Sequence, residues 1–434
     1  MPRIELQLGN KNDNALTNTL VQMILLVIYR FLLDVMYTQW IVPNYRYYGF
    51  QYSYAFRCAI LSWCGTIVFG IVGINLFKRG KATDTIIGLL ILLYYYPMCS
   101  LCMNSNNDLT YFLFANLYFF LLVLCNNIVK IPDITRRLSA RSKLFDILIV
   151  IMGLMMVGIS GVFTGFRISF DLSEYYELRT EAAMYSMPTI ISFAFYWGLN
   201  LIPVGLSYAL INKKRVMIVF CLIAQALAFS FNGKKSVLFI MFLMIGISIF
   251  YKNEYRKHIP LYFSLVAIAS YVESIIRGTN SFLVKYFIRR LMFIPAFLGE
   301  KYYEYFSAHE FDYLRSSILR RIGLISPYSN GIPKTMGQYI YGNSTNANTG
   351  LCGDAFANFG WVSLLFYPLL IILTFKILER LMDQVDQRLV FAVCFTVSYT
   401  FLSGSYFTNL LTNGFIILCL LMAICPRKVT ETYV

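Results

Sequence analysis

The sequence predicts an all-α polytopic membrane protein, and three observations support this class. Of 434 residues, 58% are hydrophobic and only 14% are charged, whereas a soluble domain carries about 25% charged residues. Apolar runs long enough for a transmembrane helix recur along the whole chain. The alternating ten-residue pattern of membrane β-strands does not occur in the sequence. We therefore expect a single integral membrane domain over residues 1–434.

About twelve apolar runs have the length of a membrane span. The seventh and eighth are short, and only Asn232, Gly233 and Lys234 separate them, so they form either two spans or one re-entrant pair. The first run is too long for a signal peptide and lacks a small-residue cleavage site, which predicts an uncleaved span. The expected limits are 17–43, 55–77, 84–103, 109–129, 144–164, 188–211, 215–231, 235–251, 258–276, 358–378, 388–403 and 409–426.

Positive charges are distributed unevenly between the two sets of connections. One set holds basic clusters such as 78–81, 136–143 and 213–215, and the other short connections hold fewer bases. Because cytoplasmic connections are enriched in Lys and Arg, we expect the richer set, and with it both termini, in the cytoplasm. The outer side then carries a shorter loop over 165–187 and a long loop over 277–357.

Composition also excludes several classes of function. The net charge of +15 does not indicate nucleic-acid binding, because the bases are scattered between spans and no soluble basic domain is present. Most cysteines lie inside apolar runs, where they are small hydrophobes, and the CxxC of Cys99 and Cys102 has no further ligands beside it. With two histidines, a zinc site cannot be assembled. We expect neither a metal nor a cofactor.

The long loop is basic and aromatic, which is typical of a functional loop rather than a tether. Its segment 281–294 is expected to form an interfacial amphipathic helix that Pro295 ends or kinks. Tyr302 and Tyr303 begin an aromatic run behind it. Aromatic faces can stack on sugars, and the arginine fork binds two phosphate oxygens at once. An ordinary interfacial belt of Tyr and Arg is the alternative.

Further bases lie on the expected outer side against the charge rule. Lys234 and Lys235 open the eighth span, and a helix N-terminus with adjacent cations binds phosphate; snorkelling lysines are the alternative. In the shorter loop, Arg179 beside two tyrosines is a candidate ligand residue, while the other charges there suit a solvated helical face.

Two charged pairs lie in or next to the expected spans. Such charges are costly in a bilayer and therefore indicate pairing or function. Arg30 and Asp34 are four residues apart in the first span and are expected to pair on one helical face. Glu273 and Arg277 repeat this spacing at the outer end of the ninth span, where Arg277 can alternate between Glu273 and a ligand phosphate.

Several segments occur in a characteristic order: NGKKSVLF, IIRG, RRLMFIPAFLGEKYYEYF, IPKTMGQYIYG and NANTGLCGDAFANFGWVSLLFYP. This order resembles that of the bacterial oligosaccharide repeat unit polymerases, the Wzy-type O-antigen and capsule polymerases. The resemblance covers roughly 230–380, and the N-terminal third is similar in hydropathy alone. Where such proteins often have Arg, this chain has Lys234 and Lys235, which neutralise a phosphate but cannot fork to it.

The resemblance implies a GT-C-like fold and a metal-independent glycosyltransferase in the bacterial cytoplasmic membrane. Its reaction would move a growing glycan from undecaprenyl pyrophosphate to a sugar hydroxyl of a new lipid-linked repeat unit at the outer face. The implied partners are undecaprenyl-pyrophosphate-linked oligosaccharides, membrane lipids, and chain-length regulator and flippase proteins. A ligase that moves the glycan to another acceptor and a flippase or transporter for lipid-linked glycans are the alternatives.

Without a metal, basic side chains must stabilise the departing pyrophosphate. The candidates are Arg277, Arg289 and Arg290, together with Lys234 or Lys235. A general base must also take the proton of the acceptor hydroxyl. Asp354 is the first candidate, because Gly350 and Gly353 let the backbone approach a sugar closely; an N-cap role is its alternative. His309 and Glu273 are reserve bases.

The expected sugar contacts come from the same loops. Asn348 and Asn358 can hydrogen-bond to sugar hydroxyls or shape turns. Tyr302, Tyr303 and Arg179 complete the expected substrate-binding set.

Overall fold

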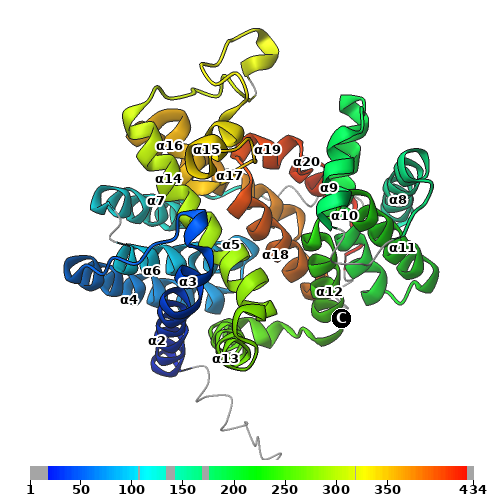
Figure 1. Ribbon diagram of the computed structural model, residues 1–434. Coiled ribbons are helices and arrows are strands. Elements are labelled where there is room, and N and C mark those ends of the chain that lie inside the picture. The colour runs from blue at the N-terminus through cyan, green and yellow to red at the C-terminus, as the bar shows by residue number, and fades with distance from the viewer. Residues whose placement is uncertain (1–17, 106–107, 133–141, 169–174, 318, 428–434) are drawn as a thin grey trace, which may run out of the picture. The chain divides into compact units, whose positions relative to one another are not determined.

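The computed structural model describes residues 18–105, 108–132, 142–168, 175–317 and 319–427 (Figure 1). Within these residues every named element is a helix. Eight helices of the described chain are long and apolar enough to cross a membrane. The predicted class, a multi-pass helical membrane protein, is therefore confirmed. They are Thr19–Tyr48, Phe56–Arg79, Ala82–Asn104, Leu109–Ile128, Lys143–Thr164, Thr189–Ile211, Arg215–Asn232 and Asn253–Asn280.

Two of the twelve expected spans are not continuous helices. In place of 358–378, η9 (Gly360–Leu365) and α17 (Tyr367–Leu381) are separated at Phe366, and Pro368 cannot continue a helix from before the break. The helical stretches Leu351–Leu365 and Tyr367–Leu381 are bent by 90° at this break. If this pair crosses the membrane as one broken span, the described residues contain up to nine candidate spans. In place of 409–426, the chain breaks before Gly414, whose φ is 81°. The prediction of single helices at these two places is wrong.

The described residues form two compact units. Unit 1 takes in the described parts of 1–120, 254–313 and 327–364, and unit 2 those of 121–253, 314–326 and 365–434. The elements of unit 1 are α2 (Thr19–Met36), η1 (Tyr37–Ile41), α3 (Val42–Tyr45), η2 (Arg46–Tyr48), α4 (Phe56–Arg79), α5 (Ala82–Leu90), η3 (Ile91–Tyr95), α6 (Tyr96–Asn104), α7 (Leu109–Ile128, shared with unit 2), η5 (Asn253–His258, whose first residue belongs to unit 2), α13 (Ile259–Arg277), η6 (Gly278–Asn280), η7 (Val284–Phe293), α14 (Ile294–Ala308), α15 (Ile332–Tyr341), α16 (Leu351–Phe359) and η9.

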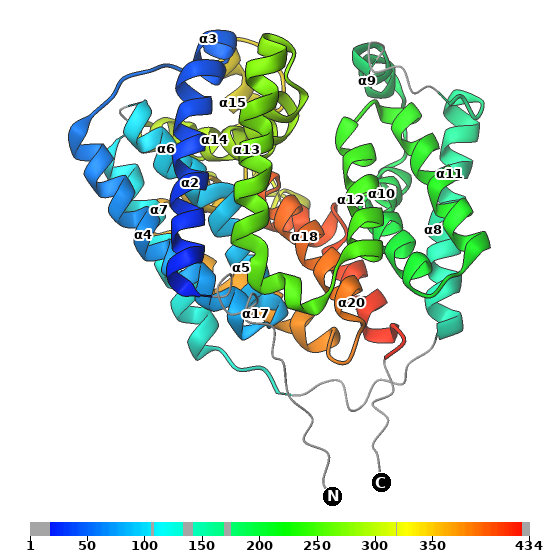
Figure 2. The ribbon, with the colours of Figure 1, turned by 90° about the horizontal axis from the view of Figure 1, so that it is seen from below.

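In unit 1, α2 and α13 run side by side in the same direction (Figure 2). At one end, the Gln22 side chain donates to the Lys257 carbonyl at 2.5 Å. At the other, the Trp40 indole donates to the Gly278 carbonyl at 2.6 Å. A parallel pair agrees with the expected alternation, in which the first and ninth spans both begin in the cytoplasm.

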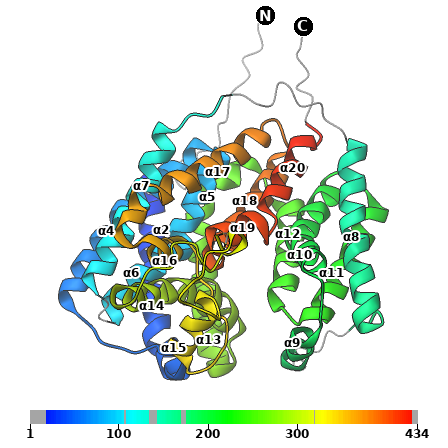
Figure 3. The same cartoon turned by 90° about the horizontal axis from the view of Figure 1, so that it is seen from above.

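The other long helices of unit 1 alternate in the expected way. The Lys78 side chain at the end of α4 donates to Thr19 at the start of α2 at 2.7 Å. Asn104, at the end of α6, donates to Asp34 near the end of α2 at 3.0 Å. The connection 37–55 and the segments 278–313 and 327–359 therefore gather at one end of unit 1, which we call the loop end. Figure 3 shows α14, α15 and α16 grouped there.

Three helices of unit 1 contain a widened π-helical segment, and each segment ends two residues before a proline. The segments are η1, η3 and η7, and the prolines are Pro43, Pro97 and Pro295. A proline inside an α-helix lacks an N–H and collides with the carbonyl four residues back. The longer spacing of π-helical hydrogen bonds avoids that collision. η7 continues directly into α14, so Pro295 does not end the helix.

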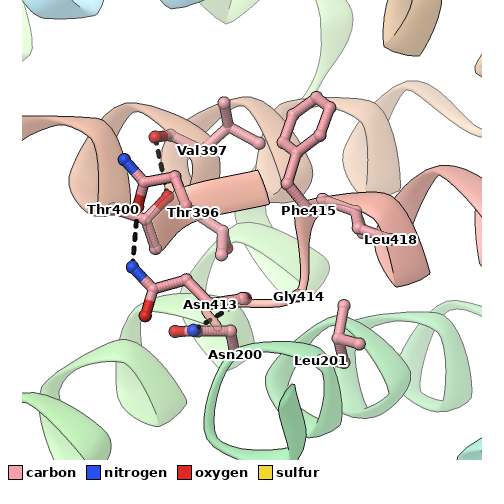
Figure 4. A pocket seen from close by; sticks show the side chains of 10 residues that line it. Asn200, Leu201, Thr396, Val397, Thr400, Asn413, Gly414, Phe415 and Leu418 are labelled. Atoms are coloured by element: carbon pink, nitrogen blue, oxygen red, sulfur yellow. Dashed lines mark hydrogen bonds between the residues drawn. The ribbon is translucent and has the colours of Figure 1, made fainter. Parts of the chain in front are cut away.

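Unit 2 contains the remaining helices and a small cavity lined by polar and apolar side chains (Figure 4). Asn200 donates to the Asn413 carbonyl at 3.0 Å, and Asn413 donates to Asn409 at 2.6 Å. These amides satisfy polar groups where the helix is broken, as a membrane interior requires. The cavity has a volume of about 10 Å³, about that of one water molecule. The helices are α8 (Ser142–Thr164), α9 (Tyr175–Met184), α10 (Thr189–Ile211), α11 (Arg215–Asn232), α12 (Lys235–Phe250), η8 (Leu319–Ile322), α17, α18 (Gln387–Ser403), α19 (Tyr406–Leu411) and α20 (Phe415–Ile424).

Candidate functional site at the loop end of unit 1

Arg289 is a buried cation at the loop end. The residue is only 6% exposed, and its guanidinium carbon lies 4.0 Å from the centre of the Tyr45 ring and 5.4 Å from that of Tyr48. Among the described residues no carboxylate pairs with it, and its Nε has no hydrogen-bond partner. Buried charges are normally paired, because the desolvation of each ion costs on the order of several kcal/mol. This arrangement therefore indicates a place for an anion.

Arg290 and Tyr341 extend the same group of side chains. Arg290 is exposed, and the Tyr341 ring lies 5.6 Å from that of Tyr48 in an edge contact. Burial raises the pKa of Tyr341 to about 12, Tyr48 adds to the rise, and the charges of Arg290 and Arg289 oppose it. Tyr341 therefore interacts electrostatically with both arginines. We call Arg289, Arg290, Tyr45, Tyr48 and Tyr341 the Arg289 cluster.

Burial sets the electrostatics of the Arg289 cluster. Desolvation lowers the pKa of the Arg289 guanidinium, Tyr45 opposes this, and the neighbouring Arg290 adds to the lowering. Arginine stays charged at neutral pH even so. Two adjacent guanidinium groups repel each other, and a bound phosphate would relieve the repulsion while accepting paired hydrogen bonds. The sequence predicted the two arginines, but not the tyrosines of η2, α3 and α15 that surround them.

Asp354 lies inside the packing of α16 rather than at an open surface. It is 6% exposed, and the Asn358 side chain donates to its carboxylate at 3.1 Å and to its carbonyl at 2.8 Å. The N-cap of α16 is Gly350, so Asp354 is not the cap that the alternative interpretation expected. Asn358 is 2% exposed, whereas Asn348 is exposed. Of the two asparagines, only Asn348 presents its amide to solvent.

Gly353 of α16 lies where α16 packs closely against α14. A Cβ at Gly353 would lie 3.2 Å from the Cα of Gly299, so α14 and α16 approach each other through two glycines. The expectation that Gly353 frees space for a sugar is not supported, because α14 fills that space.

Tyr302 and Tyr303 are structural residues in this fold. They are 3% and 5% exposed. Tyr302 donates to the Ala347 carbonyl at 2.7 Å, and Tyr303 donates to Thr110 at 2.9 Å. Their rings offer no open face, and the prediction that they stack on a sugar is corrected accordingly.

The reserve bases have different surroundings. The Glu273 carboxylate accepts from the backbone N–H groups of Phe282 and Leu283 and lies 3.6 Å from Arg277, so it anchors the start of η7. The Arg277 side chain is 62% exposed at the end of α13. His309 is exposed and stacks on Tyr305, with 3.9 Å between ring centres. Of Asp354, Glu273 and His309, only His309 is open to solvent.

The remaining candidates belong to unit 2. The Lys234 amine lies 4.7 Å from the centre of the Tyr196 ring, and Lys235 begins α12. Arg179 lies in α9, and its side chain is outside the described residues. These three residues are therefore placed only within their own unit.

Within the first span, Arg30 pairs with Asp34 as predicted. The Asp34 carboxylate also accepts from Ser100 at 2.6 Å and from Asn104 at 3.0 Å. This buried pair holds α2 against α6.

Glu300 is a titratable residue that sequence reasoning missed. It lies in α14, which is not one of the candidate spans. Burial of its carboxyl raises the pKa to about 8; Lys301 opposes the rise, and Glu304 and Asp108 add to it. Its position in GEKYYEYF, between a glycine and a lysine, gave no signal of this environment.

No family model, no curated protein and no solved structure matches the chain in comparisons with known proteins.

Proposed function

We propose that the protein polymerises lipid-linked oligosaccharide repeat units by transferring a glycan block at the outer face of a bacterial cytoplasmic membrane. The observation that carries this proposal is Arg289, a buried guanidinium that no described carboxylate neutralises. It lies against the Tyr45 ring at the loop end, near the end of the first candidate span, and precedes Arg290 in the chain. A lipid pyrophosphate would sit at this depth, with its prenyl chain in the bilayer.

The reaction forms one bond and breaks one. The oxygen of an acceptor sugar hydroxyl bonds to the anomeric carbon of the donor glycan, and the bond from that carbon to the pyrophosphate oxygen breaks. Undecaprenyl pyrophosphate leaves with the bonding electrons, and the hydroxyl proton passes to a base. Arg289 and Arg290 stabilise the charge that develops on the leaving group, a contribution of roughly 100-fold in rate for one such group.

The base remains a choice between two residues. Asp354 is the first candidate from the sequence, but its side chain is buried beside Asn358. His309 is exposed at the end of α14, where a sugar hydroxyl can reach its ring. Exposure favours His309, and substitution of each residue separates the two.

The alternative functions differ in their products. A ligase would use the same leaving group and a different acceptor, so the Arg289 cluster does not separate it from a polymerase. A flippase needs a passage through the membrane region, whereas the Arg289 cluster gathers cations at one end of unit 1. A cation cluster at one end suits the binding of a leaving group, which favours an enzyme over a flippase.

Deletion of the gene followed by inspection of the surface glycan tests the proposal. Single-repeat products support a polymerase. Accumulated lipid-linked polymer would indicate a ligase, and untranslocated precursor would indicate a flippase; either result contradicts the proposal.

A further inference from the structure

A groove with a volume of about 340 Å³ lies at the loop end of unit 1 between α14 and α15. This volume is at the lower end of the range for small-molecule sites, about 300–1,000 Å³. The lining combines two aromatic rings, two amides, two hydroxyls and one amine. The lining residues are Tyr305, Asn330, Lys334, Thr335, Gln338, Tyr339 and Ser344.

The two aromatic rings of the groove are held in fixed positions. Tyr339 is 44% exposed, yet its hydroxyl donates to Glu304 at 2.6 Å. The Tyr305 ring lies 5.1 Å from that of Tyr339 in an edge contact and stacks on His309. Exposed rings that neighbours hold in place lose little entropy on binding. Such rings suit a ligand with flat apolar faces.

The polar side chains of the groove are available to a ligand. Among the described residues, the side chains of Asn330, Lys334 and Gln338 form neither a hydrogen bond nor an ion pair with the protein. Amides both donate and accept hydrogen bonds, as vicinal hydroxyls do. Glu304, by contrast, is engaged by Lys301 and Tyr339. The free groups thus match a polyhydroxylated ligand better than an anion alone.

The Asn-rich segment after α15 forms the rim of the groove. The backbone N–H of Ala347 donates to the Pro333 carbonyl at 2.9 Å, and Tyr302 holds the Ala347 carbonyl. The segment crosses α15 at Gly337, where a Cβ would overlap the Thr345 carbonyl. Ser344 thereby comes to the groove. Tyr302 is in this way a positioning residue for the rim.

α15 connects the groove to the Arg289 cluster. Lys334, Gln338 and Tyr339 line the groove, and Tyr341 at the end of the same helix contacts Tyr48 of the cluster. Seven residues separate Lys334 from Tyr341, which is about 10 Å along a helix at 1.5 Å per residue. The groove and the Arg289 cluster therefore share one short helix.

We propose that the groove between α14 and α15 is a carbohydrate-binding subsite that holds a sugar of the oligosaccharide next to the Arg289 cluster. Tyr305 and Tyr339 pack on the C–H faces of the ring. Asn330, Gln338 and Ser344 bind its hydroxyls, and Lys334 donates to a hydroxyl or a carboxylate. The placement beside a pyrophosphate rests on the proposed function, whereas the binding of sugar by the groove does not.

Binding to the purified full chain in detergent tests this subsite. The probe is the lipid-free oligosaccharide released by mild acid from the surface polysaccharide of the cell that carries this chain, and titration calorimetry gives its Kd. Tyr339→Ala should weaken binding by about tenfold or more, as the loss of a central aromatic contact does. Gln338→Ala, an exposed position on the same helix, should weaken it in the same direction if Tyr339→Ala fails to fold.

Two further variants make the result specific. Tyr52→Ala removes another exposed tyrosine of unit 1, outside the groove, and should leave the Kd unchanged. Arg289→Ala should also leave it unchanged, because the probe carries no pyrophosphate, although glycan polymerisation in cells should fail.

The outcomes separate the two proposals. Absence of probe binding, or an equal Kd in wild type, Tyr339→Ala and Gln338→Ala, overturns the carbohydrate subsite. Weaker binding in the groove variants supports it. If those variants also made normal long-chain glycan, the subsite would stand and the proposed function would be contradicted.

Discussion

The guanidinium of Arg289 lies 4.0 Å from the centre of the Tyr45 ring, inside unit 1 and without a described carboxylate beside it. A cation–π contact stabilises the folded protein by about 0.5–2 kcal/mol. This gain is smaller than the desolvation cost of burying the guanidinium charge. The fold therefore keeps a charge that is unfavourable in the unliganded protein. A bound anion explains why such an arrangement is useful.

The identity of the base is tested by two single substitutions. Asp354→Asn keeps the shape of the side chain and its contact with Asn358, so it should leave long-chain glycan unchanged if Asp354 only holds α16. His309→Ala should shorten the glycan to single repeats if His309 takes the proton. Gel separation of surface glycan gives the answer. An active His309→Ala together with an inactive Asp354→Asn would reverse the assignment.

The loop end should face away from the cytoplasm. An epitope tag between Asn330 and Gly331, in the exposed turn before α15, should react with antibody in spheroplasts without permeabilisation. A tag after Lys81, at the opposite end of unit 1, should react only after permeabilisation. The reverse pattern would contradict the outer location of the site.

Glu300 should make stability depend on pH. Its pKa rises from the usual 4.5 to about 8 in the folded protein, so between these values the folded state binds a proton that the unfolded state does not. Stability from this group is thus complete below about pH 4.5 and is lost as pH rises through 8. In detergent, the Tm of wild type should fall more steeply from pH 5 to 8 than that of Glu300→Gln. Parallel curves would show that Glu300 is ionised in the folded state.

The packing of α14 against η3 and α7 should tolerate no side chain at Gly299. A Cβ there would overlap the Tyr94 hydroxyl, which is hydrogen-bonded to Tyr111 at 3.0 Å. Gly299→Ala should cost about 1–3 kcal/mol, as overpacking of a core does, and lower the Tm. Gly246→Ala in α12 meets nothing within 4 Å and should be neutral or slightly stabilising. Equal Tm values for the two variants would contradict the close approach.

Hydropathy was sufficient to predict the helical class and most span limits, because a bilayer requires long apolar helices. It failed at Phe366 and Gly414, where local backbone breaks interrupt a run that stays apolar. Composition predicted Arg289 and Arg290 as candidates, because the long loop that contains them is basic and aromatic rather than a polar tether. Tyr302 and Tyr303 were assigned to the surface because an aromatic run gives no sign of which rings the rest of the chain covers.

The groove could not be predicted from sequence because its walls are far apart in the chain. Tyr305 comes from α14, Tyr339 from α15 and Ser344 from the segment behind it. The pattern IPKTMGQYIYG indicates the helix α15, but it does not indicate that α14 forms the other wall of the groove. The raised pKa of Glu300 results first from burial, and Asp108, which is distant in the chain, adds to it. It was hidden for the same reason.

The central claim is that Arg289 exists to bind pyrophosphate, and direct binding tests it best. Purified wild-type protein, Arg289→Ala, Arg289→Lys and Arg57→Ala are titrated with undecaprenyl pyrophosphate, and undecaprenol serves as the ligand without phosphate. Arg57 is an exposed arginine of unit 1 outside the cluster, which makes its variant the matched control. Arg289→Ala also removes an unpaired buried charge, so its Tm should not fall.

We predict that Arg289→Ala weakens pyrophosphate binding by about tenfold to a hundredfold, that Arg289→Lys lies between, and that Arg57→Ala and undecaprenol binding are unaffected. Equal affinity of wild type and Arg289→Ala for undecaprenyl pyrophosphate would contradict the account.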